Sequence, residues 1–361
     1  MKIAYIISTL ERCGPVNVLF DLVRFLSAEN SIRVYTLATE PANSRETDFL
    51  QLGVRVECVF DSRLESFAMG SEKLEKAMRD FNPDVIHVHG FRATILCSGL
   101  QQPSLVTVHN CLYEDYRLTY GRFRARWMAR TESAALKKFD MVIGCSESCS
   151  RVLHDVYDID AHSIRNGVDQ SVYSPLSVDE KRKIRSSLKI DTDSKVYIST
   201  GGCTERKGTL ELIRSFNIWH QGHSHDVLHI LGSGPLLDEC RRVAGEGVTL
   251  HGFCEDVLPW LQASDVFVSN SCSEGMPLAV LEAMSCGCFA LLSSITPHYE
   301  IAKVCPSNVR LVEFKDPSSF GLTEEQFSAL NLGDLNELSS SLMSHRYYKA
   351  YSKVIESRGS K

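Results

Sequence analysis

The chain has 361 residues, of which 43% are hydrophobic and 23% charged, a composition that excludes disordered, collagen-like and coiled-coil proteins. At roughly 150 residues per domain this length predicts two domains. The formal net charge of −6 argues against a protein built to coat nucleic acid, and no apolar run approaches the 18 or so residues of a membrane span.

The first half of the chain alternates short β-branched runs with helical patterns. It predicts strands over residues 3–8, 31–37, 54–60, 84–89, 104–109 and 140–146, with a helix over 17–26 after the first strand. Strands separated by helices imply parallel βαβ units with helices on both sheet faces. Ser8, His89, His109 and Ser146 then fall at the carboxyl edge of the sheet, where ligands bind in such folds.

The alternation of predicted strands and helices is interrupted near residue 170 and resumes after it. We expect helices over 178–188, 209–220, 236–243, 277–285 and 340–355, and strands over 196–200, 227–231, 248–251, 266–269 and 288–292. The predicted fold class is α/β, with two Rossmann-like doubly wound parallel-sheet domains. Their expected bounds are 1–169 and 170–340, with a C-terminal helix in 341–361 that crosses back to the N-terminal domain.

The most specific motif is the segment Ser-Glu-Gly-Met-Pro-Leu-Ala-Val-Leu-Glu-Ala-Met-Ser-Cys-Gly, residues 273–287. Pro277 suits the first turn of a helix, which places Glu274 in the loop before it and Glu282 about 1.5 turns inside. A helix start favours phosphate, and a carboxylate beside it can bind hydroxyls of a sugar or ribose. The alternative is an ordinary amphipathic helix, but Glu282 stands among apolar residues, where an unpaired charge would be costly.

This Glu-x7-Glu block resembles glycosyltransferase family 4 (glycosyl transferases group 1), retaining enzymes of the GT-B fold. Other segments agree with that family in the same order along the chain: 83–89, 107–109, 166–169, the Gly-rich loop 200–208, 231–236, 251–253 and 263–265. The resemblance runs from residue 1 to about 300. It implies two domains facing each other across a cleft, the N-terminal one binding the acceptor and the C-terminal one the nucleotide-sugar.

The resemblance also implies roles for individual residues. Glu274 would contact the donor sugar, and Glu282 the ribose hydroxyls. Lys207 and Arg206 would neutralise the diphosphate as charge develops on the leaving group. Independently of the family, two cations beside a glycine at a strand-to-helix turn can act as a phosphate clamp, although a solvated charge pair is the simpler alternative. The candidate catalytic residues are Glu274, His109 and Lys207, and the candidate donor-binding residues are Arg206, Lys207, Glu282, Gly14, Gly275, Met276, Pro277 and Phe253.

The chain departs from the family pattern at two places. Many relatives carry an Arg directly after the first Gly of the phosphate loop, where this chain has Gly202 or Cys203. The family also has two glycines after its first strand, and only Gly14 matches here. Arg206 is the residue that could replace the missing arginine.

Residues 113–138 have a different character. Their basic residues, which outnumber the acidic ones, are Arg117, Arg122, Arg124, Arg126, Arg130, Lys137 and Lys138. If the segment is helical, Tyr120, Phe123 and Trp127 share one side and an arginine stripe adjoins them. Such a surface suits peripheral docking on an anionic membrane. The alternative, a helix that packs its aromatic residues on its own sheet, is equally open.

The sequence argues against metal-dependent, hydrolase, P-loop and NAD-binding functions. The pairs Asp158/Asp160 and Asp191/Asp193 imitate a metal-binding D-x-D motif but lie in connecting segments, so we expect no cofactor and no essential metal. Hydrolase, P-loop and NAD-binding motifs are absent from the sequence. The thirteen scattered cysteines indicate a reduced cytoplasmic protein, one that can lie peripherally on the inner face of the plasma membrane.

The sequence therefore predicts a retaining glycosyltransferase. It would move a sugar from a nucleotide-sugar, with UDP as the expected nucleotide, to a saccharide or lipid-linked acceptor in bacterial surface polysaccharide (lipopolysaccharide, O-antigen or capsule) assembly. Two alternatives stay open. One is a nucleotide-sugar epimerase or phosphorylase of the same fold, and the other is a non-catalytic nucleotide-sugar-binding protein.

Overall fold

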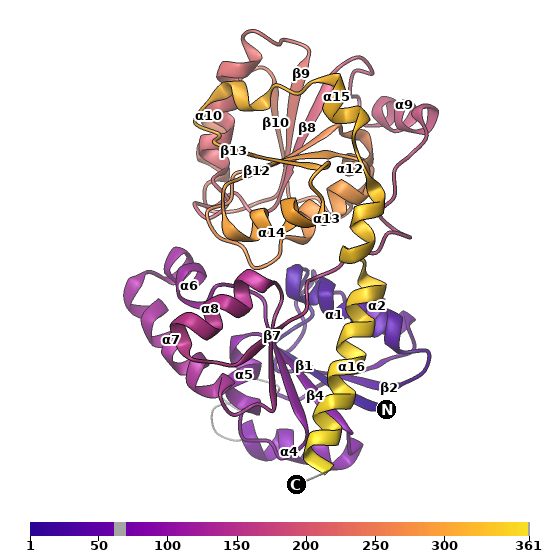
Figure 1. Cartoon of the computed structure of the whole chain (residues 1–361), viewed down its shortest axis with the longest axis vertical. Helices are drawn as coiled ribbons and strands as arrows, with labels where there is room; N and C mark the ends of the chain where they lie inside the picture. The colour runs from indigo at the N-terminus through magenta and orange to yellow at the C-terminus, as the bar shows by residue number, and fades with distance from the viewer. Residues whose placement is uncertain (61–69, 360–361) are drawn as a thin grey trace. The chain divides into compact units, whose positions relative to one another are not determined.

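The computed structural model describes residues 1–60 and 70–359 and divides the chain into two compact units (Figure 1). The N-terminal unit comprises Met1–Gly167 together with Ser340–Lys361, and the C-terminal unit comprises Val168–Ser339. The boundary thus lies two residues before the 169/170 position expected from the sequence. The C-terminal helix belongs to the N-terminal unit.

The N-terminal unit is built on a seven-stranded parallel sheet with the order β3-β2-β1-β4-β5-β6-β7. Its strands are β1 (Lys2–Ile7), β2 (Ser31–Thr36), β3 (Arg55–Cys58), β4 (Val85–His89), β5 (Ser104–Val108), β6 (Met141–Gly144) and β7 (Ala161–Ser163). Every residue of β4 and of β5 is buried, as expected for central strands covered by helices on both faces.

The helices of this unit follow the strands in the manner of βαβ units. They are α1 (Gly14–Leu26), α2 (Glu46–Gln51), α4 (Gly70–Phe81), α5 (Phe91–Cys97), α6 (Leu112–Tyr120), α7 (Arg122–Leu136), α8 (Glu147–Tyr157) and α16 (Ser340–Gly359). Gly121, with φ +79°, separates α6 from α7, so the basic segment forms two helices instead of one.

The C-terminal unit has a six-stranded parallel sheet with the order β10-β9-β8-β11-β12-β13. Its strands are β8 (Lys195–Thr200), β9 (Asp226–Leu231), β10 (Val248–Gly252), β11 (Val266–Ser269), β12 (Phe289–Ser293) and β13 (Val309–Val312). Its helices are α9 (Val178–Ser187), α10 (Thr209–His220), α11 (Leu237–Val243), α12 (Leu258–Ala263), α13 (Leu278–Ser285), α14 (Thr296–Val304) and α15 (Glu324–Ser328), with 3₁₀ turns η1 (Pro317–Phe320) and η2 (Leu332–Leu338).

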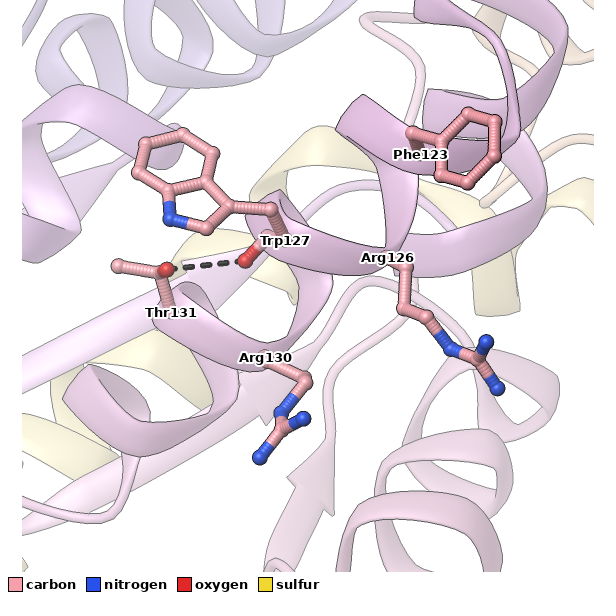
Figure 2. Close-up of a pocket in the computed structure, with 5 residues that line it drawn as sticks. All are labelled: Phe123, Arg126, Trp127, Arg130 and Thr131. Carbon is pink, nitrogen blue, oxygen red and sulfur yellow. Dashed lines mark hydrogen bonds between the residues drawn. The ribbon is translucent and has the colours of Figure 1, made fainter.

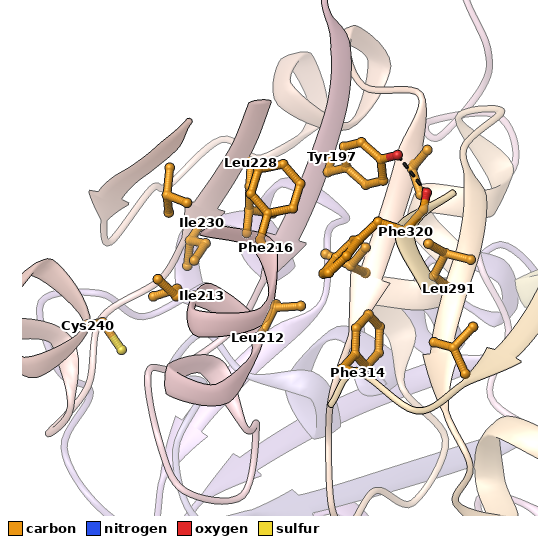
Figure 3. Close-up of a cluster of buried hydrophobic side chains, with 14 of the residues drawn as sticks. Tyr197, Leu212, Ile213, Phe216, Leu228, Ile230, Cys240, Leu291, Phe314 and Phe320 are labelled. Atoms are coloured by element: carbon orange, nitrogen blue, oxygen red, sulfur yellow. Dashed lines mark hydrogen bonds between the residues drawn. The ribbon is translucent and has the colours of Figure 1, made fainter. Parts of the chain in front are cut away.

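An aromatic cluster fills the core of this unit (Figure 3). Tyr197 of β8 and Phe216 of α10 contact each other and Phe320 of η1, with ring centroids 5.1–5.8 Å apart. The hydroxyl of Tyr197 donates to the carbonyl of Phe320 at 2.7 Å. Residues 303–335 therefore contribute to this core through Val312, Phe314 and Phe320.

Helix α16 is joined to the N-terminal sheet by buried hydroxyls and one imidazole. The Tyr351 hydroxyl lies 3.1 Å from the Tyr5 hydroxyl and 2.8 Å from Nδ1 of His87. Nε2 of His87 lies 2.7 Å from the Thr107 hydroxyl, which in turn is 2.9 Å from the hydroxyl of Tyr347. This chain of hydrogen bonds satisfies polar groups that would be costly to bury unpaired, and it connects β1, β4, β5 and α16.

The predicted class, two doubly wound parallel-sheet domains, is confirmed. Two short strands were missed because neither carries a long apolar run: β7 reads Ala-His-Ser and β13 reads Val-Arg-Leu-Val. Helix α1 begins three residues earlier than predicted, with Pro15 in its first turn, where the missing N–H of proline is tolerated.

We predict that Tyr351→Phe destabilises the N-terminal unit by about 1–3 kcal/mol, because it leaves the Tyr5 hydroxyl and Nδ1 of His87 without this partner. Urea denaturation measures the change. Tyr348→Phe on the same helix is the control, since Tyr348 is 37% exposed. Equal stabilities of the two variants would contradict the structural role given to the buried hydroxyl.

Candidate functional site

Two glycine-rich loops lie at the carboxyl edge of the C-terminal sheet. The loop after β8 ends at Gly208, which has φ +61° and where an added Cβ would lie 2.3 Å from the carbonyl oxygen of Asn270. The loop after β9 contains Gly232, where a Cβ would lie 1.7 Å from the carbonyl oxygen of Gly201. A side chain at either position would force the neighbouring loop away, which explains why the sequence has glycine there.

The close approach at Gly208 lets the preceding cations reach the loop after β11. Nζ of Lys207 donates to Oε1 of Glu274 at 2.5 Å, and a guanidinium nitrogen of Arg206 donates to Oε2 at 2.9 Å. Arg206 also donates to the carbonyl of Ser273, and the Ser271 hydroxyl donates to Oε1 of Glu274 at 2.7 Å. One carboxylate thus orders two cations at a sheet edge where parallel α/β folds bind ligands.

Glu274 stays ionised in spite of its burial. Burial by itself would raise the pKa of this carboxyl, but the charges of Lys207 and Arg206, together with hydrogen bonds from Lys207 and Ser271, lower it to about 2. The carboxylate and its two cations form a cluster with a net positive charge of one. Such a cluster can exchange part of its internal pairing for an anionic ligand.

Ser293 and His298, which the sequence did not indicate as site residues, are linked to this cluster through the backbone of Ser271. The Ser293 hydroxyl donates to the carbonyl of Ser271 at 2.7 Å, and Nδ1 of His298 donates to the Ser293 carbonyl at 2.8 Å. His298 is fully buried, and burial is the main reason that its pKa falls to about 4. No local pattern in the sequence predicts these contacts, which come from three separate segments.

The remaining candidate donor-binding residues of the C-terminal unit surround the start of α13. Gly275, Met276 and Pro277 are buried in the loop, and Glu282 is half-buried within the helix. Phe253, which follows β10, is 62% exposed. The structure therefore brings Glu274, Arg206 and Lys207 into direct contact, and none of the hydrogen bonds above includes Glu282 or Phe253. Their functional roles stay predictions.

The two candidates of the N-terminal unit lie at the same edge of their own sheet. His109 directly follows β5 and is half-buried, and Nε2 of its ring lies 2.8 Å from Nδ1 of the fully buried His89 at the end of β4. Burial lowers the pKa of His109 to about 4, so its imidazole is neutral at pH 7. Gly14 is the first residue of α1 and has open space where a Cβ would be.

Helix α7 presents an exposed basic and aromatic surface (Figure 2). Phe123 is 95% exposed and Trp127 64% exposed, so these side chains do not pack on the sheet. They line a hollow of about 430 Å³ with Arg126, Arg130 and Thr131. In the view of Figure 2 the side chains of Arg126 and Arg130 run downward from the helix, and the rings of Phe123 and Trp127 lie above them. Within the described residues, neither arginine is ion-paired with a carboxylate.

Neither a metal-binding cluster nor a membrane-spanning helix occurs in the part of the chain that the structure describes. No three His, Cys, Asp or Glu residues there are grouped so that they could hold a metal ion. Asp158 is the left-handed residue that ends α8, and Asp191 lies in an exposed turn, as expected for solvated turns. Across residues 1–60 and 70–359, no helix combines the length and apolarity required to span a bilayer.

The lowered pKa of Glu274 predicts a pH dependence of stability. A carboxyl whose pKa drops from its ordinary 4.5 to about 2 stabilises the folded state above pH 4.5, and this contribution is lost as the pH falls toward 2. Between pH 6 and pH 3 the unfolding free energy of the wild type should lose on the order of 2 kcal/mol more than that of Glu274→Gln. Urea denaturation at both pH values measures this, with the exposed Glu246→Gln as control, and a pH-independent difference would contradict it.

Two family models match successive parts of the chain, and both describe glycosyltransferases. The model of Glycosyltransferase Family 4 matches residues 13–172, and that of Glycosyl transferases group 1 matches residues 194–322. The O-antigen biosynthesis glycosyltransferase WclY of Escherichia coli is 23% identical over 314 residues, which cover 83% of this chain and 82% of that protein. The UDP-Gal:α-D-GlcNAc-diphosphoundecaprenol α-1,3-galactosyltransferase of Escherichia coli is 27% identical over 270 residues, covering 68% and 67%.

Solved structures show the same fold. The structure of Anabaena HepE in complex with UDP-glucose has a TM-score of 0.82 at 16% identity, covering 98% of this chain and all of that one. WaaG, a glycosyltransferase involved in lipopolysaccharide biosynthesis, has a TM-score of 0.65 at 14% identity, covering 98% and 98%. The chain has the GT-B fold, and a family 4 model and a group 1 model, both of glycosyltransferases, match successive parts of it.

Proposed function

We propose that the protein transfers a sugar from a UDP-sugar to a saccharide or lipid-linked acceptor, with retention of the anomeric configuration, in the assembly of a bacterial O-antigen or related surface polysaccharide. The observation that carries the proposal is the ordered pair Lys207 and Arg206, held by Glu274 at the carboxyl edge of the C-terminal sheet. Two cations at a strand-to-helix turn are suited to a diphosphate.

The names of similar proteins support the choice of donor and acceptor. One relative takes a UDP-sugar and a diphosphoundecaprenol-linked acceptor, WclY acts in O-antigen biosynthesis, and the HepE structure contains UDP-glucose. We assign the nucleotide-sugar to the C-terminal unit and the acceptor to the N-terminal unit.

The proposed chemistry follows from charge. When the bond between the anomeric carbon and the diphosphate breaks, negative charge builds on the leaving oxygen, and Lys207 and Arg206 would stabilise it. Glu274 and His109 would contact the donor sugar, while Glu282 would accept hydrogen bonds from the ribose hydroxyls.

Because no residue suggests itself as a covalent nucleophile, we propose a same-face displacement in which the leaving phosphate accepts the proton of the acceptor's hydroxyl group. Positive charge from protein side chains makes an essential metal unnecessary in this proposal.

We further propose that α7 docks on an anionic membrane surface, where a lipid-linked acceptor would be found. Phe123 and Trp127 expose large apolar areas beside Arg126 and Arg130, and this combination binds interfaces that contain acidic lipids.

We predict that purified protein releases UDP from one UDP-sugar only when a bacterial glycolipid extract is present. Glu274→Ala and Lys207→Ala should each lower kcat by about 10²–10³-fold, because each removes an interaction with the reacting donor. Nucleotide release across UDP-, GDP- and ADP-sugars measures this, and the anomeric coupling constant of the product tests retention. Activity should persist in EDTA.

Three other outcomes would contradict the proposal. Release of free sugar without an acceptor would favour an epimerase or phosphorylase, and nucleotide binding without turnover would favour a non-catalytic binding protein. Loss of all activity in EDTA would overturn the metal-independent mechanism. Glu246→Gln, an exposed change in the same unit, is the control for the effect of purification and handling.

For the membrane surface, we predict that Arg126→Gln/Arg130→Gln lowers affinity for vesicles of phosphatidylcholine with about 30% phosphatidylglycerol by about 30-fold, at roughly 1 kcal/mol for each arginine. Co-sedimentation measures the affinity. Lys349→Gln/Lys353→Gln on the exposed face of α16 removes the same charge and should have little effect. Equal losses in both double variants would indicate attraction by overall charge and contradict docking through α7.

A further inference from the structure

His89 and His109 form a neutral hydrogen-bonded pair at the carboxyl ends of two neighbouring strands. Nδ1 of His89 lies 2.8 Å from Nε2 of His109, and the rings are stacked at 23° with centroids 5.1 Å apart. The pair follows from the sheet itself: β4 and β5 are parallel neighbours, His89 is in register with Thr107, and His109 lies two residues further on. Burial keeps both imidazoles uncharged at neutral pH, because it lowers the pKa of each ring.

A neutral imidazole has one N–H and one bare nitrogen, so this contact allows only two arrangements. Either His89 donates from Nδ1 to Nε2 of His109, or His109 donates from Nε2 to Nδ1 of His89. The first leaves a proton on Nδ1 of His109 and a bare Nε2 on His89. The second leaves an N–H on Nε2 of His89 and a bare Nδ1 on His109.

The environment of His89 distinguishes the two arrangements. Nε2 of His89 is buried and has no hydrogen-bond partner among the described residues. In native proteins a buried N–H without an acceptor is rarer than a buried acceptor without a donor. The bare Nε2 is therefore the better state of His89, and His89 is the donor to His109.

Packing against His87 also fixes the orientation of the pair. The His89 ring packs on the ring of His87, with centroids 4.1 Å apart, and His87 is fixed by its bonds to Tyr351 and Thr107. Rotation of the His89 ring would disturb this buried network. His109, which is half-buried, therefore has a fixed partner on Nε2, while the described residues provide no acceptor for its Nδ1.

We propose that His89 is a positioning residue that fixes His109 in the tautomer protonated on Nδ1, so that His109 presents a neutral N–H donor to an oxygen of the donor sugar. This inference rests on the role proposed above for His109. His89 itself touches no substrate in this account. It acts by setting which nitrogen of its neighbour carries the proton, and by holding the plane of that ring.

Two substitutions of His89 distinguish the effect of its hydrogen bond to His109 from the effect of its packing, because the new side chains are similar in size and differ in whether they can donate. In His89→Asn the amide nitrogen can replace Nδ1 as donor, whereas the side chain of His89→Asp can only accept. We expect ¹⁵N NMR to find the His109 proton on Nδ1 in the wild type and in His89→Asn, and on Nε2 in His89→Asp. We expect kcat to fall about 100-fold in His89→Asp and less than about threefold in His89→Asn, with the KM for the donor nearly unchanged in both.

Several results would overturn the proposal. A His109 proton on Nε2 in the wild type would do so, and this measurement is independent of whether any variant folds. Retention of the wild-type tautomer or the wild-type kcat in His89→Asp would also overturn it. Absence of turnover with every donor would instead refute the proposed function, because the NMR result still reports on the pair alone. His162→Asp, an exposed histidine of β7, is the control variant.

Discussion

The buried carboxylate of Glu274 is the charge on which the C-terminal site depends. An ionised carboxylate can be buried only when its hydrogen-bonding capacity is filled, and here Lys207, Arg206 and Ser271 fill it. The same contacts hold two long cationic side chains, which would otherwise sample many rotamers, in one arrangement before any ligand binds. Gly208 makes this possible, because only glycine allows the loop after β8 to approach the loop after β11 so closely.

In the N-terminal unit the buried polar groups are neutral, in contrast to the ionised Glu274 of the C-terminal unit. The imidazoles of His87 and His89, buried at the centre of its sheet, carry no charge and are held by hydroxyls and by the ring of His109. A neutral network of this kind is compatible with binding hydroxyl-rich sugars, for which directional hydrogen bonds matter more than net charge. The contrast between the two units is therefore consistent with the proposed division into an acceptor half and a donor half.

Most strands could be predicted, because each depends on a local run of buried residues, and the motif of residues 273–287 identified Glu274 as a candidate site residue. The ion pairs of Glu274 with Lys207 and Arg206 join two loops far apart in the sequence and could not be predicted. The contacts of Ser293 and His298 could not, since they form between segments that only the folded sheet brings together. The pairing of His89 with His109 could have been predicted from the sequence. Two successive parallel strands end in Val-Ile-His-Val-His and Leu-Val-Thr-Val-His, and adjacent parallel strands bring their carboxyl ends together.

The cations ordered by Glu274 are proposed to bind a diphosphate. Isothermal titration of wild type and Lys207→Met with UDP, UMP and uridine can test this binding. The wild type should prefer UDP to uridine strongly, and Lys207→Met should lose at least about tenfold of this preference, as expected when one charge-assisted hydrogen bond is removed. An unchanged preference in Lys207→Met would mean that the diphosphate is bound elsewhere, and the role proposed for Lys207 would be wrong.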